Sequence, residues 1–345
     1  MNRRVQGAAM REYELEVLEQ YHIEKISTRK IRGAFFIDTN EGTMLLKETT
    51  LSDRRALLLY TLLCHLEAVQ YPDVDTPVFN QEHALVSTSR DGKRYMLKKW
   101  YGGRECDVRR ENDVLDAAAN LARLHRKMRW QNVCGVSERE EIRPPVGRHL
   151  KEEFVRYNRE LKKVRSFVRS RVNKGKFEYL YLENFERMYQ IAMDVTRSLE
   201  QSGYESLYRE SIEENLLIHG DYNYHNVILT SGKMATVNFE RFRLDVQAQD
   251  LYYFLRKVME KHHWNPKLGD AMLDAYSRRR PLNSRELEYI ALKLAYPEKF
   301  WKVANTYYHS NKAWIPEKNV EKLMLATLQT EEKNKFLEDV FSFHL

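Results

Sequence analysis

The stretch that decides the fold is LIHGDYNYHNVIL, residues 217–229. An apolar run leads into His219 and Asp221, Asn226 follows Asp221 by five residues, and a second apolar run begins directly after it. Both apolar runs have the length and composition of short strands, so the polar residues are predicted to lie on the loop between them. An aspartate and an asparagine on one such loop can place a proton-accepting carboxylate and a metal-binding amide oxygen in the same site.

Transfer of a phosphoryl group uses this combination of side chains. A carboxylate orients and deprotonates the acceptor hydroxyl, oxygen ligands hold magnesium, and a cation pairs with the nucleotide phosphates. HGDYNYHN resembles the HxDxxxxN catalytic loop of aminoglycoside and choline kinases. The resemblance implies that Asp221 is the catalytic base, that Asn226 is a magnesium ligand, and that His219 belongs to the catalytic loop mainly as its brace. The alternative is an ordinary polar turn between two strands.

Residues on both sides of this loop extend the resemblance. Lys47 in MLLKE ends a predicted strand, where kinases keep the lysine that binds nucleotide phosphates; the simpler interpretation is a lysine at a strand edge. Asp250 in QDLYYFLRK resembles the aspartate that fixes the catalytic loop by hydrogen bonds. His125 in LARLH is interpreted as a packing residue.

The early part of the chain has the pattern of a small sheet. Residues 31–48 (IRGAFFIDTNEGTMLLKE) and 84–100 (ALVSTSRDGKRYMLKKW) each predict two strands around a turn. Between them, residues 54–69 (RRALLLYTLLCHLEAV) predict a buried helix, for which Ser52 and Asp53 are the candidate caps. Residues 101–104 (YGGR) predict a flexible link.

Helical patterns dominate after this link, beginning with DVLDAAANLARLHRKM, and glycine and proline number only 13 and 8 in 345 residues. The sequence therefore predicts an α+β, protein-kinase-like fold of two lobes. We expect a small β-rich N-terminal lobe over residues 1–100 and a large helical C-terminal lobe over residues 101–345, with the catalytic-loop-like motif in the second.

Charge and composition limit the classes of partner. The net charge of +7 is mild for a chain in which 31% of residues are charged, and this argues against a nucleic-acid-binding role. The sequence contains no run of about 18 apolar residues, so no transmembrane helix is predicted. The first residues also lack the apolar core of a signal peptide. Three widely spaced cysteines are typical of reduced thiols. A cytoplasmic protein without a membrane partner is predicted.

Residues 151–176 form one strongly basic segment, with ten Lys or Arg against three Glu. Its apolar residues recur every three or four positions, which predicts an amphipathic helix. They are Phe154, Tyr157, Leu161, Val164, Val168 and Val172. The helix is interpreted as one that packs on the core with a solvated basic face; the alternative is a docking face for an acidic partner or a phosphate-bearing ligand.

Four segments make the resemblance more specific than the kinase fold. They are WYGGRECD (100–107), HGDYNYHNVI (219–228), the NFE…DLYYFLRKVMEKHHW stretch (238–264) and YPEKFWKVANTYYHSNKAWIP (296–316). Together they resemble the CotS family of spore coat proteins over roughly residues 10–340. The resemblance implies a product of a spore-forming bacterium that is made in the cytoplasm of the mother cell and deposited on the spore coat, with other spore coat proteins as partners.

The sequence departs from the kinase pattern at three points. Kinases of this fold have a magnesium-binding aspartate shortly after the catalytic loop, where this chain has Asn238 in VNFE. Magnesium normally takes one or two carboxylates, so Asn226 and Asn238 as metal ligands predict weak binding of magnesium and ATP. Residues 51–66 contain no glutamate to pair with Lys47, and KIRGAFF offers one glycine, Gly33, instead of a glycine-rich phosphate loop.

These departures favour a coat or coat-assembly protein that uses a kinase scaffold with weak or no phosphotransferase activity. The presence of Asp221, Asn226 and Lys47 leaves open an active ATP-dependent kinase whose acceptor is a small hydroxylated molecule, such as a coat sugar. A binder of nucleic acid or another acidic polymer, acting through the basic helix, is the third alternative.

Overall fold

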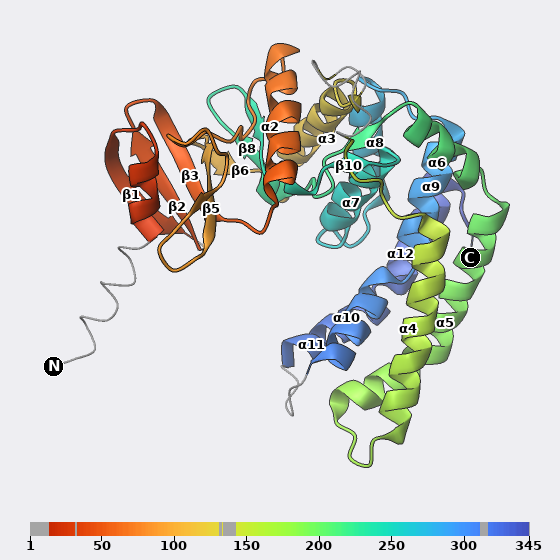
Figure 1. The fold of residues 1–345 in the computed structure, drawn as a ribbon. Coiled ribbons are helices and arrows are strands. Elements are labelled where there is room, and N and C mark those ends of the chain that lie inside the picture. Colours follow the sequence, from red (N-terminus) through yellow and green to blue (C-terminus); the bar gives the residue numbers. More distant parts are fainter. Residues whose placement is uncertain (1–13, 32, 131–132, 134–142, 311–316, 345) are drawn as a thin grey trace. The chain divides into compact units, whose positions relative to one another are not determined.

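The structure is a computed structural model that describes residues 14–344 except 32, 131–132, 134–142 and 311–316. Its elements fall into two compact units (Figure 1). The first unit comprises residues 1–107, 123–145 and 217–243, and the second comprises residues 108–122, 146–216 and 244–345. The predicted lobes were two continuous stretches that meet near residue 100, whereas each of these units combines three separate segments. The predicted lobe boundary stays a prediction.

An antiparallel five-stranded sheet forms the early part of unit 1. Its spatial order is β1-β2-β3-β5-β4. The strands are β1 (Lys25–Ile31), β2 (Ala34–Thr39), β3 (Gly42–Glu48), β4 (Ser87–Thr88) and β5 (Arg94–Lys99). Both predicted hairpins are therefore confirmed. The strand β1 was missed because all of its side chains are exposed, so its sequence lacks an apolar face.

Helix α2 (Asp53–Ala68) follows the first hairpin, where the helical pattern predicted it. The Ser52 side chain accepts a hydrogen bond from the Arg55 N–H at 3.3 Å, which satisfies one of the free amides of the first turn. Of the two predicted caps, Ser52 is confirmed, and Asp53 is instead the first residue of the helix.

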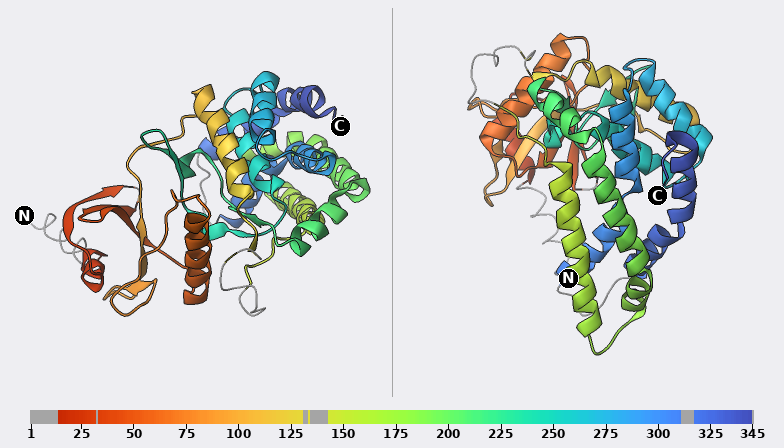
Figure 2. Two further views of the ribbon diagram at one scale, coloured as in Figure 1. Left: turned by 90° about the horizontal axis from the view of Figure 1, so that it is seen from above. Right: turned by 90° about the vertical axis from the view of Figure 1, so that its right-hand side faces the viewer.

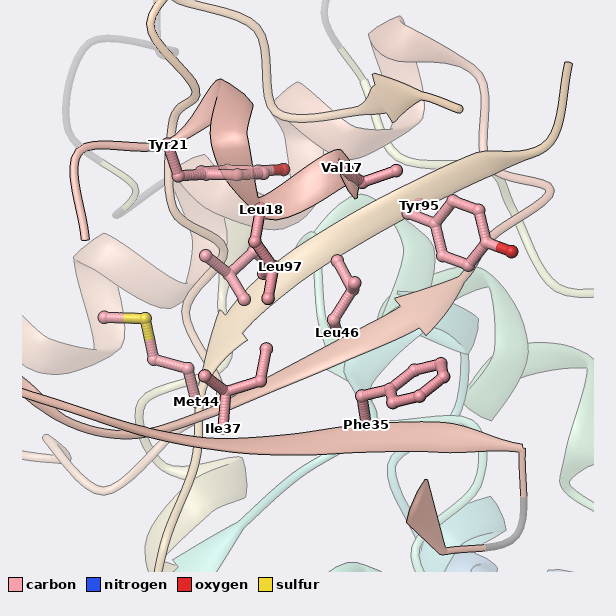
Figure 3. Packing of buried hydrophobic residues seen from close by; sticks show 9 residues of the cluster. All are labelled: Val17, Leu18, Tyr21, Phe35, Ile37, Met44, Leu46, Tyr95 and Leu97. Atoms are coloured by element: carbon pink, nitrogen blue, oxygen red, sulfur yellow. The ribbon is translucent and has the colours of Figure 1, made fainter. Parts of the chain in front are cut away.

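Alternation along the strands gives the sheet two different faces. Leu46 on β3 and Leu97 on β5 point to one side, where they join a buried apolar cluster with residues of the 3-10 helix η1 (Val17–Gln20) (Figure 3). The neighbouring positions Lys47 and Lys98 therefore point to the opposite side. Burial of the apolar cluster fixes the register, because a slip by one residue would exchange the two faces.

The remainder of unit 1 is built from short elements in the region of the predicted catalytic loop. They are β6 (Arg104–Glu105), β7 (Leu217–Ile218), η3 (Tyr224–Asn226), β8 (Val227–Leu229), β9 (Met234–Thr236) and η4 (Phe239–Arg241). The strand β6 pairs with β8, with Arg104 opposite Leu229. Arg104 is thus part of a strand, and the prediction that residues 101–104 form a flexible link is wrong at this position.

Unit 2 is helical, and α3 (Glu111–His125) and β10 (Arg243–Leu244) begin in one unit and end in the other. In Figures 1 and 2, α4 and α5 run side by side. Its other helices are α4 (Leu150–Ser170), α5 (Lys176–Gln201), α6 (Tyr204–Glu213), α7 (Ala248–Met259), α8 (Pro266–Ser277), α9 (Ser284–Ala295), α10 (Glu298–His309), α11 (Glu317–Leu328) and α12 (Thr330–Phe341). None of the helices in the described parts of the chain is both long and apolar enough to cross a membrane.

The basic segment forms the amphipathic helix α4 as predicted, with one correction. The residues from Phe154 to Val168 that were predicted to face the core are buried. Val172 is 96% exposed and lies beyond the helix end at Ser170, so it does not belong to the apolar face. Cys64 is half-buried and Cys106 is buried, and Cys134 lies outside the described residues.

Candidate functional site

The predicted catalytic loop begins directly after β7 and depends on a glycine. Gly220 has a φ of +81°, in the left-handed region that side chains other than glycine rarely adopt. A Cβ atom at Gly220 would lie 2.3 Å from the carbonyl oxygen of Arg241. The loop and the end of η4 can approach this closely because residue 220 has no side chain.

We expect Gly220→Ala to lower the free energy of unfolding by about 2–3 kcal/mol, because alanine adds both backbone strain and a backbone clash. Gly232→Ala is the matched control. Gly232 has the same φ of +81°, but nothing lies within 4 Å of the position of its Cβ. Denaturant unfolding of both variants separates the two effects, and equal losses would show that the close approach to Arg241 is not important.

His219 is fully buried and links the catalytic loop to Val237, the residue after β9. Its Nε2 lies 3.0 Å from the carbonyl oxygen of Val237, and its Nδ1 accepts a hydrogen bond from the Asp221 N–H at 3.1 Å. Because a carbonyl oxygen only accepts, Nε2 carries the proton and the ring is neutral. This geometry suits a brace that positions Asp221, and no atom of the imidazole is left to act on a substrate.

A chain of hydrogen bonds connects the four other residues that the sequence singled out. Asn226 Nδ2 donates to the Asp221 carbonyl oxygen at 2.8 Å, and this directs Asn226 Oδ1 toward Asn238. Asn238 Nδ2 donates to that Oδ1 at 2.8 Å. Asn238 Oδ1 then faces Lys47, whose Nζ donates to it at 3.4 Å. Each amide orientation follows from its neighbours, because a carbonyl can only accept and an ammonium can only donate.

Asp221 itself is half-buried, and its carboxylate is held in place. Oδ1 accepts a hydrogen bond from Asn223 Nδ2 at 3.1 Å, and Oδ2 lies 3.9 Å from Arg241 Nη1. A carboxylate with both oxygens near donors has a defined orientation, as a general base requires.

Asn238 has an unusual backbone that buried groups maintain. Its φ of 66° and ψ of 53° place it in the left-handed region, which asparagine tolerates better than most residues. The Asn238 N–H donates to Asp75 Oδ2 at 2.8 Å. Asp75 is fully buried in the segment between α2 and β4, and this bond anchors the segment that carries Asn238.

Asp75 belongs to a buried ionic cluster that the sequence analysis did not predict. Lys98 Nζ lies 2.8 Å from Asp75 Oδ2 and also contacts Glu240 Oε1. Burial lowers the pKa of Lys98, but the two carboxylates outweigh burial and raise it above its ordinary value. Burial raises the pKa of Glu240, but Lys98 and then Lys47 outweigh it and lower the pKa to about 2. The cluster therefore contains a protonated lysine and an ionised Glu240.

Helix α2 supplies an arginine, Arg55, that contacts the segment following Asn238. Arg55 Nη2 donates to the Glu240 carbonyl oxygen at 3.2 Å and also to that of Phe242, and the guanidinium lies 3.8 Å from the centre of the Phe242 ring. Glu67 at the other end of α2 pairs with Lys99 at 2.9 Å. The glutamate of α2 is thus engaged by Lys99 of β5.

The residues present do not fit a strongly bound magnesium ion. In the described parts of the chain, no group of three His, Cys, Asp or Glu side chains is placed to hold a metal. The Asn226 oxygen that would bind the ion accepts a hydrogen bond from Asn238 instead. Magnesium favours charged oxygen ligands, and two neutral amides that are bonded to each other provide none.

The sequence analysis found the four hydrogen-bonded residues Lys47, Asn238, Asn226 and Asp221. It missed the buried ionic cluster of Asp75, Lys98 and Glu240. Lys98 and Lys99 are adjacent and chemically identical in the sequence, yet the Lys98 side chain is 1% exposed and that of Lys99 is 52% exposed. The alternation of β5 was the available signal, because it places Lys98 on the same face as Lys47. Asp250 is buried in α7 of unit 2, and His125 is buried at the end of α3.

Comparison with known proteins identifies the family. The model of the phosphotransferase enzyme family matches residues 32–287, about three quarters of the chain. The chain belongs to this family. The chain is also 23% identical over 333 residues to spore coat protein S of Bacillus subtilis (strain 168), and the match covers 94% of this chain and 92% of that protein.

Solved structures share the fold. An aminoglycoside phosphotransferase from Alicyclobacillus acidocaldarius has a TM-score of 0.81 and 17% sequence identity, covering 95% of each chain. A spectinomycin phosphotransferase, solved with ADP and spectinomycin, has a TM-score of 0.65 and 10% identity, covering 94% of this chain and 98% of its own. The predicted protein-kinase-like α+β fold is confirmed, and so is the resemblance to the CotS spore coat proteins.

Proposed function

We propose that this member of the phosphotransferase family serves the spore coat or its assembly and has weak or no phosphotransferase activity. The hydrogen bond between Asn238 Nδ2 and Asn226 Oδ1 carries the proposal. An active kinase of this fold would bring a negative charge and a magnesium ion to this point. Here the amide N–H of Asn238 takes the place of the metal ion as the partner of Asn226 Oδ1. This oxygen therefore has a hydrogen-bond donor without a metal.

The nucleotide side of the site supports the same conclusion. Ile31 of β1 pairs with Ala34 of β2, so only residues 32 and 33 connect the two strands. A connection of this length offers few backbone N–H groups to a phosphate. Lys47 remains available as a cation for phosphate. Its Nζ donates to the neutral amide oxygen of Asn238, which holds an ammonium less firmly than a carboxylate would.

The assignment to the coat rests on the whole-length similarity to spore coat protein S. A protein of this kind would be made in the cytoplasm of the mother cell, join the developing spore and contact other coat proteins. ATP and magnesium would bind weakly, since the chain keeps Lys47, Asp221 and Asn226 without an aspartate at position 238.

A second candidate function is supported by the oriented carboxylate of Asp221. With both of its oxygens near donors and His219 bracing its backbone, Asp221 retains the geometry of a general base. An ATP-dependent phosphotransferase acting on a small hydroxylated acceptor would use this carboxylate to accept the proton of the attacking hydroxyl.

Calorimetric titration of ATP into the purified protein, with magnesium and then with EDTA, separates the two functions. We expect ATP to bind no more tightly than millimolar, with magnesium or with EDTA. We also expect Asp221→Ala protein to reach the spore coat as the wild type does. Micromolar, magnesium-dependent binding, together with a turnover that Asp221→Ala abolishes, would contradict the proposal and support the active kinase.

A further inference from the structure

Unit 2 contains a small pocket with charged and apolar side chains in its wall, and none of them belongs to the candidate site. It has a volume of about 40 Å³ and lies among α5, α7, α9, α10, α11 and α12. A water needs roughly 10–15 Å³ by this measure, so the pocket has room for a few waters or for one carboxylate or phosphate group. Its apolar wall includes Met188 and Ile191 of α5.

Two buried donors in the wall of this pocket lack acceptors. Arg256 is 7% exposed and Trp264 is 4% exposed. Arg256 Nε and Trp264 Nε1 have no hydrogen-bond partner among the residues that the structure describes. A buried donor without an acceptor costs about 1–3 kcal/mol, so two in one pocket indicate that an acceptor-bearing group binds there.

Lys333 of α12 adds a third donor to the pocket. Its Nζ donates to the carbonyl oxygen of Ala295 at 3.0 Å, which leaves two of the three ammonium protons for other acceptors. Burial and then the nearby Arg256 lower the pKa of Lys333 to about 8. A bound anion would relieve the repulsion between these two cations.

The two carboxylates in the pocket are already neutralised. Glu260 lies 3.2 Å from Arg256 Nη1 and 3.5 Å from Lys299 Nζ. Glu298 accepts a hydrogen bond from the Tyr252 hydroxyl and pairs with Lys302 through its other oxygen. Neither carboxylate is positioned to satisfy Arg256 Nε or Trp264 Nε1.

Charge then decides which acceptor fits. The pocket is lined by three cations, Arg256, Lys299 and Lys333, against two carboxylates. A metal ion would be repelled by the excess positive charge and could not accept from the unpaired N–H groups. A neutral ligand would leave the excess positive charge uncompensated. We propose that this pocket binds a small oxyanion, a carboxylate or a phosphate group, through Arg256, Trp264 and Lys333.

The indole N–H of Trp264 reports binding directly. In a proton–nitrogen correlation spectrum of the full-length ¹⁵N-labelled chain, the Trp264→Phe variant identifies this resonance among those of the five tryptophans. Inorganic phosphate and acetate are titrated separately at constant ionic strength into the millimolar range. We expect a saturable shift of the Trp264 resonance with at least one of the two anions.

The Lys333→Met variant should weaken this binding by about tenfold or more, because a charge-assisted hydrogen bond is lost. Lys335→Met is the matched control. Lys335 lies on the same helix but is exposed, so its variant should bind as the wild type does. A response to phosphate alone assigns a phosphate-bearing ligand, and a response to acetate assigns a carboxylate. No saturable shift with either anion, or equal shifts in Lys333→Met, would overturn the proposal; Lys333→Gln provides a second test with a polar side chain.

Discussion

Asn238→Asp is expected to make the stability of the protein depend on magnesium. In EDTA, a carboxylate oxygen would face Asn226 Oδ1, where an amide N–H now donates at 2.8 Å. Asn226 cannot reverse its amide without losing its bond to the Asp221 carbonyl. We expect a loss of about 1–2 kcal/mol in EDTA. Magnesium should restore the lost stability. In the presence of ATP, the affinity of the variant for magnesium should be at least about tenfold higher than that of the wild type, because a carboxylate replaces an amide as ligand.

Thermal unfolding with and without magnesium, followed by the ATP titration, measures both effects. Asn215→Asp is the matched control. Asn215 also has a left-handed backbone, with a φ of 53°, and its side chain donates to the Glu213 carbonyl oxygen. The same chemical change there should give no magnesium dependence. If Asn238→Asp is as stable in EDTA as the wild type, the hydrogen bond between the two asparagines does not hold the site closed.

Lys98→Met should give the largest loss of stability, about 3–5 kcal/mol at neutral pH. The variant would leave the buried carboxyl of Asp75 without its ammonium partner, and removing one member of a buried ion pair is strongly destabilising. The Asn238 N–H would remain as a donor to Asp75, but a neutral amide compensates less charge than an ammonium. Denaturant unfolding measures the loss.

The pH dependence of this loss follows from the carboxylate. Burial already raises the pKa of Asp75 in the folded protein, and the loss of Lys98 would raise it further. The penalty is therefore full above the folded-state pKa of Asp75, shrinks as pH falls between the folded and unfolded values, and disappears below the unfolded pKa. Lys99→Met is the matched control, because Lys99 is exposed and its pair with Glu67 is worth at most about 1 kcal/mol. Similar losses in both variants, or a loss that does not shrink toward pH 4, would contradict a role for the buried cluster.

The secondary structure around the site could be predicted because its signals are local. The turn residues between β2 and β3, the Ser52 cap of α2 and the alternation of β5 each act within a few residues along the chain. The strand β1 shows the limit of such signals. Its pairing with β2 makes it a strand, although its own side chains are all exposed.

The catalytic loop was recognisable for a similar reason. The spacing of His219, Asp221 and Asn226 places them on one short turn, and the replacement of an aspartate by Asn238 can be read directly from the sequence. The absence of a partner glutamate on α2 could be read in the same way. These are statements about which chemical groups are present, and they favoured a weak or inactive site before any distance was known.

By itself, the sequence determined the chemical character of this site: a base at Asp221, a cation at Lys47 and two neutral amides at Asn226 and Asn238. Only the tertiary structure decided that the two amides bond to each other and that Lys98, not Lys99, is buried. The physical reason is distance along the chain. Asp75, Lys98 and Glu240 are separated by 23 and 142 residues, and no local pattern specifies a charge pair that forms only when three segments pack together.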